Sequence, residues 1–306
     1  MSADFLMVDD LRPEGLRSVL GLAAAVKETP AEYGGRLDGA RVGLFFEKPS
    51  TRTRVSSEVA CVDLGAHPVV LKNEEVGLGK REAVEDVARV LDRYLDVLAF
   101  RVFDHGNLVS VAASAQAPVI NLLSDRSHPC QALADLQTVA EHFDPIAGTT
   151  LTYVGDGNNV AHSLLIGGAM SGMHIRVACP DGFEPARDIV DRALAIANGT
   201  GGSVEVGHDA AGLVAGSDVV YTDVWTSMGQ EGESAERKAL FAPYRVDGRL
   251  FEAAGDAAIF LHCLPAHRGE EVAHEVIEHE RSFVFDQAEN RMHAFKALLL
   301  HLTGTA

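Results

Sequence analysis

Apolar and polar residues alternate along this chain in blocks whose periods predict strands separated by helices. Short apolar runs rich in β-branched residues predict strands, and longer segments in which apolar residues recur every three or four positions predict helices. In the first half the predicted strands are Val42–Phe46, Pro68–Leu71, Val97–Val102 and Val119–Leu122. The predicted helices are Arg12–Lys27, Arg54–Leu64, Glu82–Tyr94, Leu108–Ser114 and Pro129–Phe143.

The same alternation resumes after the break Asp144-Pro145-Ile146-Ala147-Gly148. The predicted strands of this half are Leu151–Val154, Ile175–Ala178, Val204–Val206, Val219–Thr222, Ala258–His262 and Phe283–Asp286, and the predicted helices are Val160–Met170, Pro185–Ala197 and Asn290–Leu302. The polar stretch Asp223–Ala239 has no clear period and predicts a long functional or mobile loop. The chain is therefore predicted to be an α/β protein of two doubly wound parallel-sheet domains, residues 1–144 and 145–306. Ligands are expected beyond the carboxyl ends of the strands, in a cleft between the domains.

Composition excludes several classes of protein. The 306 residues are 47% hydrophobic and 23% charged, which is typical of a folded globular protein. A net charge of −18 makes nucleic acids and anionic membranes unexpected partners. The four cysteines form no C-x-x-C pair, so neither a zinc ribbon nor a disulfide framework is predicted. The N-terminal segment has no signal-peptide pattern and no apolar run is long enough to span a membrane, which predicts a cytoplasmic protein.

The sharpest chemical signal is Ser50-Thr51-Arg52-Thr53-Arg54, which follows the first predicted strand. Hydroxyls and backbone N–H groups at a helix start bind anions, and the planar fork of Arg52 suits phosphate oxygens. The alternative is an ordinary helix cap followed by solvated arginines. No Walker sequence is present, so a phosphate here would not be held by a P-loop.

Further polar residues follow other strands of the first half. Arg101 closes a buried apolar run, and His128-Pro129-Cys130-Gln131 opens the next predicted helix. His128 could donate to a carbonyl oxygen, and Gln131 could hold an amide. The alternatives are a solvated strand end for Arg101 and a helix-start histidine with proline in the first turn for His128.

The second half carries polar groups at corresponding positions. Gly155-Asp156-Gly157-Asn158-Asn159 departs from a dinucleotide fingerprint because its third glycine position is Val160, so its asparagines either bind an amino acid or cap a helix. Asp223 follows one strand and His262-Cys263-Leu264-Pro265 ends another, where Cys263 is either a nucleophile or a small buried hydrophobe. Arg291 is predicted to lie at the start of the last helix.

In order along the chain, the motifs F-x-K-x-STRTR, HPCQ, GDGNN, DxWxSMGQE, HCLPAHRG and ENRMHA resemble those of the ornithine carbamoyltransferase family. The resemblance covers essentially the whole chain. The first two motifs are shared with aspartate carbamoyltransferases, whereas the SMG and HCLP segments point to ornithine. The resemblance implies a carbamoyl-phosphate domain (1–144), an ornithine domain (145–306) and a final helix, about 289–303, that packs back on the first domain.

The resemblance also implies transfer of a carbamoyl group to L-ornithine, without cofactor or metal, by a homotrimer with sites at subunit boundaries. It implies that carbamoyl phosphate contacts Ser50, Thr51, Arg52, Thr53, Arg101, His128, Gln131, Cys263, Leu264 and Arg291, and that ornithine contacts Asn159, Asp223, Ser227 and Met228. Of these, Arg52, Arg101, His128, Asp223 and Cys263 are the expected catalytic residues. Covalent catalysis by Cys263 is not required, because the carbamoyl group is already activated.

One position departs from the family pattern. Relatives commonly carry Gln or His in the loop before the helix predicted at Glu82–Tyr94, where it reaches the neighbouring subunit's carbamoyl phosphate, but this chain has Gly77. Either Lys80 or Arg81 replaces that side chain, or the pocket differs. The alternatives are therefore a carbamoyltransferase for a related amine, such as putrescine or an acylated ornithine, or a non-catalytic amino-acid-binding paralogue.

Overall fold

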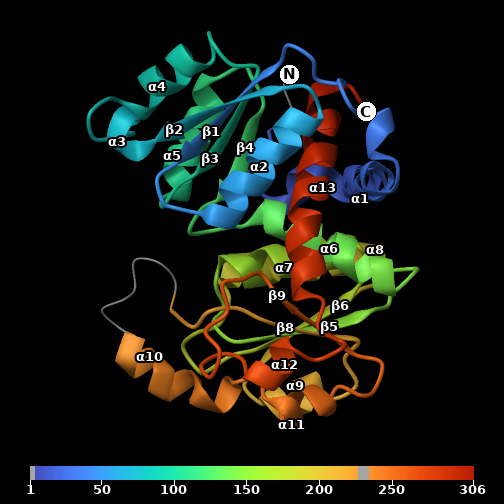
Figure 1. The fold of residues 1–306 in the computed structure, drawn as a ribbon. Coiled ribbons are helices and arrows are strands. Elements are labelled where there is room, and N and C mark those ends of the chain that lie inside the picture. Colours follow the sequence, from blue (N-terminus) through green and yellow to red (C-terminus); the bar gives the residue numbers. More distant parts are fainter. Residues whose placement is uncertain (1–3, 227–233) are drawn as a thin grey trace. The chain divides into compact units, whose positions relative to one another are not determined.

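Two parallel β-sheets organise the chain. The computed structural model describes residues 4–226 and 234–306. It divides into a first unit, Met1–Gln137 with Glu289–Ala306, and a second unit, Thr138–Ala288. The predicted α/β class with parallel sheets is confirmed in each unit (Figure 1). Among the described residues, no helix has both the length and the apolar content needed to cross a membrane.

The sheet of the first unit has four parallel strands in the order β2-β1-β3-β4. Its strands are β1 (Arg41–Phe46), β2 (His67–Lys72), β3 (Val97–Arg101) and β4 (Val119–Leu123). Its helices are α1 (Arg12–Glu28), α2 (Thr51–Asp63), α3 (Asn73–Val76), α4 (Val84–Leu91), α5 (His105–Ser114), most of α6 (Pro129–His142) and most of α13 (Val284–Thr303).

Helices α4 and α5 form one apolar cluster with this sheet (Figure 1). Val87 of α4 and Leu108 of α5 are buried with Phe45 and Phe100, two strand residues whose rings lie 5.1 Å apart. Strand β2 is an edge strand, and none of its residues is fully buried. Burial of β1, β3 and β4 therefore holds the carboxyl ends of three neighbouring strands in fixed positions.

The second unit has five parallel strands in the order β7-β6-β5-β8-β9. These are β5 (Thr150–Val154), β6 (His174–Ala178), β7 (Ser203–Gly207), β8 (Val219–Thr222) and β9 (Ile259–His262). Its helices are α7 (Asn159–Met170), α8 (Arg187–Thr200), α9 (Ala210–Val214), α10 (Ser234–Phe241), α11 (Gly248–Glu252) and α12 (His274–Ile277). Residues of α9, α11 and α12 share a buried cluster with β5 and β9, while α7 packs against α8.

Two predictions about elements of the second half are wrong. The run Phe283–Asp286 is not a strand, because α13 begins at Val284 and passes through it. The expected loop Asp223–Ala239 includes the start of α10, which begins at Ser234. The predicted ornithine residues Ser227 and Met228 lie outside the described residues.

Candidate active site

The start of α2 forms an anion-binding geometry at the carboxyl end of β1. Ser50 is the N-cap residue, with extended backbone, and its Oγ accepts a hydrogen bond from the Thr53 N–H at 3.3 Å. The helix begins at Thr51, three residues earlier than predicted. Its first N–H groups and the positive end of its dipole are therefore directed at the loop that leaves β1.

Two buried guanidinium groups converge on this helix start. Arg101, the last residue of β3, donates from Nη1 to Thr53 Oγ1 at 3.3 Å, and Arg291 donates from Nη2 to the same oxygen at 3.4 Å. All three side chains are buried. Arg291 was predicted at a helix start, which is wrong, because α13 begins seven residues earlier. Two delocalised positive charges beside a helix N-terminus are suited to phosphate oxygens.

His128 and Gln131 lie at the start of α6 and are buried. Burial lowers the pKa of His128 well below its ordinary value, and the positive charges of Arg291 and Arg101 lower it further. The ring is therefore neutral at pH 7. Gln131 Oε1 accepts a hydrogen bond from Arg291 Nη1 at 2.5 Å, so α6 is joined directly to Arg291.

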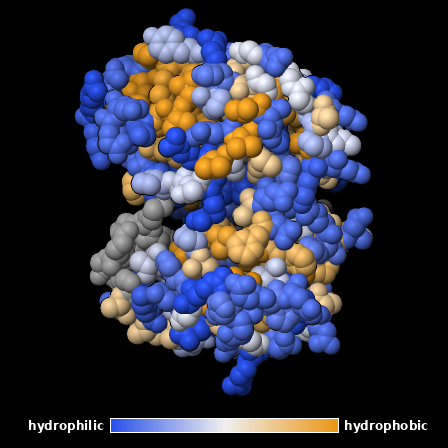
Figure 2. Space-filling model, viewed as in Figure 1, coloured by the Kyte–Doolittle hydropathy of each residue, from blue (hydrophilic) through white to orange (hydrophobic). Residues whose placement is uncertain are grey.

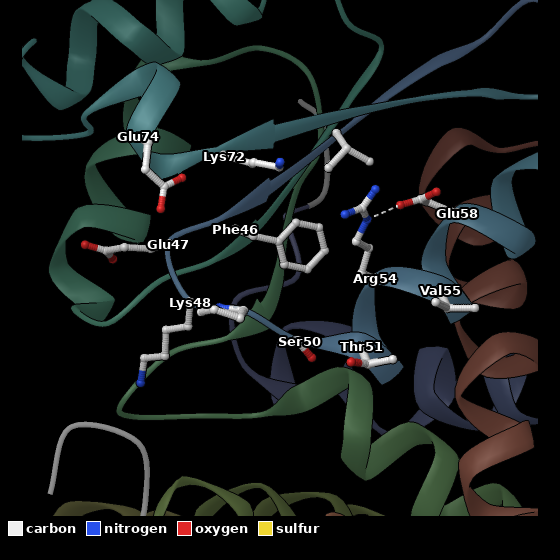
Figure 3. A pocket seen from close by; sticks show the side chains of 12 residues that line it. Phe46, Glu47, Lys48, Ser50, Thr51, Arg54, Val55, Glu58, Lys72 and Glu74 are labelled. Carbon is white, nitrogen blue, oxygen red and sulfur yellow. Dashed lines mark hydrogen bonds and ion pairs between the residues drawn. The ribbon is translucent and has the colours of Figure 1, made fainter. Parts of the chain in front are cut away.

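Arg52 differs from Arg101 and Arg291 because its side chain is exposed. It is exposed in the first turn of α2, and within residues 4–226 and 234–306 its side chain has no hydrogen bond or ion pair. Arg54, two residues on, forms an ion pair with Glu58 at 2.6 Å. The exposed face around Arg54 borders a cavity of about 490 Å³, whose lining includes Ser50, Thr51 and Lys72 (Figure 3). Ser50 and Thr51 thus line this cavity, whereas the Thr53 hydroxyl contacts the two buried arginines.

In the second unit, Asp223 joins the carboxyl ends of three strands. It follows β8 directly and is buried, and its Oδ1 accepts a hydrogen bond from Cys263 Sγ at 2.9 Å. Its Oδ2 accepts from Asn158 Nδ2 at 2.9 Å. Asn158 also caps α7, because its Oδ1 accepts from the N–H groups of Val160 and Ala161. Asn158 therefore both caps α7 and positions the carboxylate of Asp223. The next residue, Asn159, lies in the first turn of α7.

The segment after β9 is held by a buried histidine and glutamate. His262 Nε2 lies 3.2 Å from Glu271 Oε1, and His262 Nδ1 accepts from the Leu264 N–H at 2.9 Å. Leu264 has a left-handed backbone, φ 56°, which non-glycine residues rarely adopt. The fixed imidazole therefore holds the turn that places Cys263 against Asp223. Ligand atoms of these two residues and His262 lie within 4.8 Å of one another, a spacing that could also hold a metal ion.

A second buried pair, Asp156 with Arg237, lies near Asp223 in the second unit. Arg237 forms an ion pair with Asp156 and donates from Nε to the Trp225 carbonyl at 2.6 Å. Its guanidinium also lies over the rings of Phe183 and Phe241, at 4.9 and 5.1 Å. Burial raises the pKa of Asp156 to about 6 against the opposing pull of Arg237. Sequence reasoning missed this pair because Arg237 falls in the stretch without a clear period.

Comparison with protein families finds two matching models. Residues 3–141 match the carbamoyl-P binding domain of the aspartate/ornithine carbamoyltransferases, and residues 147–302 match the Asp/Orn binding domain of the same family. Together these matches cover nearly the whole chain.

Curated relatives and solved structures agree with these matches. The chain is 51% identical over 303 residues to an ornithine carbamoyltransferase of Parafrankia sp., covering 97% of this chain and 95% of that protein. It is 52% identical over 308 residues to an ornithine carbamoyltransferase of Acidothermus cellulolyticus, covering 100% and 98%. The structure of ornithine carbamoyltransferase from Pyrococcus furiosus superposes with a TM-score of 0.96 at 46% identity, covering 99% and 97%.

Proposed function

Because this chain belongs to the aspartate/ornithine carbamoyltransferase family, we infer that it transfers the carbamoyl group of carbamoyl phosphate to the δ-amine of L-ornithine, which yields L-citrulline and phosphate. The observation that carries the donor half of this proposal is the convergence of Arg101 and Arg291 on Thr53 at the N-terminus of α2. A helix start with two buried guanidinium groups matches the charge of a bound phosphate ester and of the phosphate that leaves.

In the proposed reaction the neutral δ-amine attacks the carbonyl carbon of carbamoyl phosphate. A C–N bond forms, the carbonyl oxygen becomes an oxyanion, and the bond from carbon to the phosphate oxygen then breaks. Arg101, the Thr53 hydroxyl and the neutral His128 are the proposed oxyanion donors, and such a donor is typically worth about 3–4 kcal/mol of transition-state stabilisation. The departing phosphate takes up the negative charge, which Arg52, Arg291 and the α2 start neutralise, with Ser50 and Thr51 as further donors.

The acceptor is proposed to bind the second unit. An amine of pKa about 10 must lose a proton before it can attack. Asp223 supplies a buried carboxylate that orients the amine, and Cys263 donates to that carboxylate in its present position. Phosphate is the proposed proton acceptor. Asn159, Ser227 and Met228 are proposed to hold the rest of ornithine, and Leu264 lies next to Cys263 in the turn after β9.

We further propose a homotrimer, in which a second copy covers the exposed face of α2. Val55, Val59 and Val62 lie on this face with exposed fractions of 54%, 39% and 62%. Figure 2 shows hydrophobic atoms gathered over α2 and beside the edge strand β2. An apolar helix face next to an edge strand is typical of a surface that a partner covers. A solution mass of one chain, 32.6 kDa, would overturn the trimer.

The test of the function is phosphate release from carbamoyl phosphate with four amines compared side by side: L-ornithine, putrescine, N-acetyl-L-ornithine and L-aspartate. We expect kcat/KM to be highest with ornithine. A higher kcat/KM with another amine would identify that amine as the acceptor in place of ornithine. No turnover with any of the four would favour a non-catalytic amino-acid-binding protein.

Variants of two arginines test the donor site. Arg101→Lys keeps the charge but loses the planar fork, so we expect kcat/KM for carbamoyl phosphate to fall at least a hundredfold with the thermal stability retained. Arg41→Lys is the matched control, because Arg41 pairs with Asp96 on the exposed amino end of β1. Equal kinetics for both variants would refute the placement of Arg101 at the reacting carbonyl.

A further inference from the structure

Gln131 and Asp135 form a buried pair on one face of α6 that has no part in the reaction steps proposed above. They lie one helical turn apart, with exposed fractions of 1% and 0%. Gln131 Nε2 donates a hydrogen bond to Asp135 Oδ1 at 2.7 Å. On the other side of the amide, Arg291 Nη1 donates to Gln131 Oε1. The amide of Gln131 is thus held at both ends by charged side chains.

Asp135 and Arg291 determine which way the amide of Gln131 points. A carboxylate only accepts hydrogen bonds and a guanidinium only donates them, whereas the two ends of an amide differ in just this property. If the amide were rotated by 180°, its oxygen would face the carboxylate of Asp135, and both are acceptors. Its NH₂ group would face the guanidinium of Arg291, and both are donors. Because buried polar groups are costly when left unmatched, only the observed orientation is stable.

The consequence is that Gln131 presents an oxygen to the site around Arg291. An amide oxygen has two lone pairs, and Arg291 uses one of them. In residues 4–226 and 234–306 no other group donates to this oxygen, so the second lone pair remains for a donor of the substrate. The carbamoyl group has such a donor in its NH₂, whereas the acyl group of acetyl phosphate has a methyl group of similar size in the same place.

We propose that Asp135 is a positioning residue that makes the site specific for carbamoyl phosphate over other acyl phosphates. It does so by holding the oxygen of Gln131 toward the amino group that only the carbamoyl compound carries. This inference rests on the proposed function, since it assumes that carbamoyl phosphate binds beside Arg291. Asp135 itself does not touch the substrate. A site that hydrogen-bonds a substrate group discriminates strongly against an analogue that lacks it.

The experiment compares two phosphates at one site: the KM of carbamoyl phosphate and the Ki of acetyl phosphate as a competitive inhibitor. Both ligands carry the same phosphate, so a general change in charge or folding moves both constants, and their ratio isolates the amino group. In Asp135→Asn the neutral side chain can turn either its oxygen or its NH₂ group toward Gln131, so position 135 no longer fixes which way the Gln131 amide points. We expect the ratio to change about tenfold in favour of acetyl phosphate, which is the loss of one hydrogen bond, about 1.4 kcal/mol.

A double variant supplies the matched rescue. In Gln131→Glu/Asp135→Asn the amide and the carboxylate exchange places on α6. The amide at position 135 then donates to the carboxylate at position 131, and that carboxylate again offers an oxygen to the amino group of the substrate. We expect the double variant to recover most of the discrimination, and Gln131→Glu alone, with two facing carboxylates, to recover none. If Asp135→Asn fails to fold, the double variant, which restores the paired geometry, still tests the inference against the wild type.

The outcomes separate this inference from the proposed function. If the wild type transfers the carbamoyl group to ornithine but binds acetyl phosphate as tightly as carbamoyl phosphate, the specificity inference is overturned and the function stands. An unchanged ratio in Asp135→Asn, with both ligands weakened equally, would also overturn it and would assign Asp135 a merely structural part. No carbamoyl transfer by the wild type would overturn the function, and this inference with it.

Discussion

Replacing Arg237 with methionine should destabilise the second unit by an amount that grows with pH. Arg237 and Asp156 form an ion pair whose side chains are 7% and 14% exposed. Removing one partner of a buried pair typically costs about 3–5 kcal/mol, because the other charge is left without compensation. Domains of about 150 residues or more lose roughly 2–4 °C in Tm per kcal/mol, so we expect a fall on the order of 10 °C at neutral pH.

The pH dependence follows from the carboxyl group that remains. Burial raises the pKa of Asp156 to about 6 even with Arg237 beside it. Without that cation the native pKa rises further, while the unfolded value stays near its ordinary 3.8. From pH 6 up to the new native pKa, the folded variant keeps a proton that the unfolded chain loses, so its stability falls as pH rises. The wild-type group is ionised in both states over this range. The deficit of the variant should therefore widen by about 1.4 kcal/mol for each pH unit from pH 6 up to the new native pKa.

The assay is thermal unfolding at pH 6 and at pH 8, at one fixed protein concentration. Arg237→Lys is the matched control, because it keeps a positive charge near Asp156 and should show little of the extra loss at pH 8. The double variant Arg237→Met/Asp156→Asn has no carboxyl group to titrate, so its deficit should be the same at both pH values. A deficit of Arg237→Met that does not change between pH 6 and pH 8 would refute the reasoning.

Three further predictions concern the loop before α4 and the thiol beside Asp223. Gly77 has φ 66°, and a Cβ there would lie 2.6 Å from the Arg81 Cβ. Gly77→Gln should therefore lower the free energy of unfolding by about 1–3 kcal/mol rather than restore the family's side chain. A Tm at or above that of the wild type would contradict this. Cys263→Ser should keep measurable phosphate release, since no covalent intermediate is proposed, and a trapped carbamoyl adduct on Cys263 in the wild type would contradict it. Lys80→Ala should raise the KM of carbamoyl phosphate more than Arg81→Ala, because Arg81 already donates to the backbone carbonyl of Glu75 in α3. Unchanged KM values for both variants would mean that the loop does not act on a neighbouring site.

The sequence determined the class of fold because its signals are local. β-branched runs alternating with segments of helical period leave few arrangements besides parallel sheets with crossover helices. The same reasoning placed Arg101 at the end of a buried strand and Ser50 at a helix start, and the structure confirms both placements. The strand predicted at Phe283–Asp286 is wrong, because a short apolar, aromatic segment has the same composition in a strand and in the first turn of a long helix. Only packing distinguishes the two.

Tertiary structure decided which side chains meet. Arg291 and Gln131 are 160 positions apart, and nothing in either local pattern says that a guanidinium will reach that amide. Arg237 likewise lies in a stretch without periodicity, yet it bonds to Asp156, 81 positions earlier in the chain. Local propensity acts over three or four residues, whereas the orientation of a buried amide or the pKa of a buried carboxyl depends on groups brought close by the packing of whole helices and strands. Which functional side chains lie at the strand ends can therefore be predicted from sequence. Which distant side chains bond to them and orient them cannot.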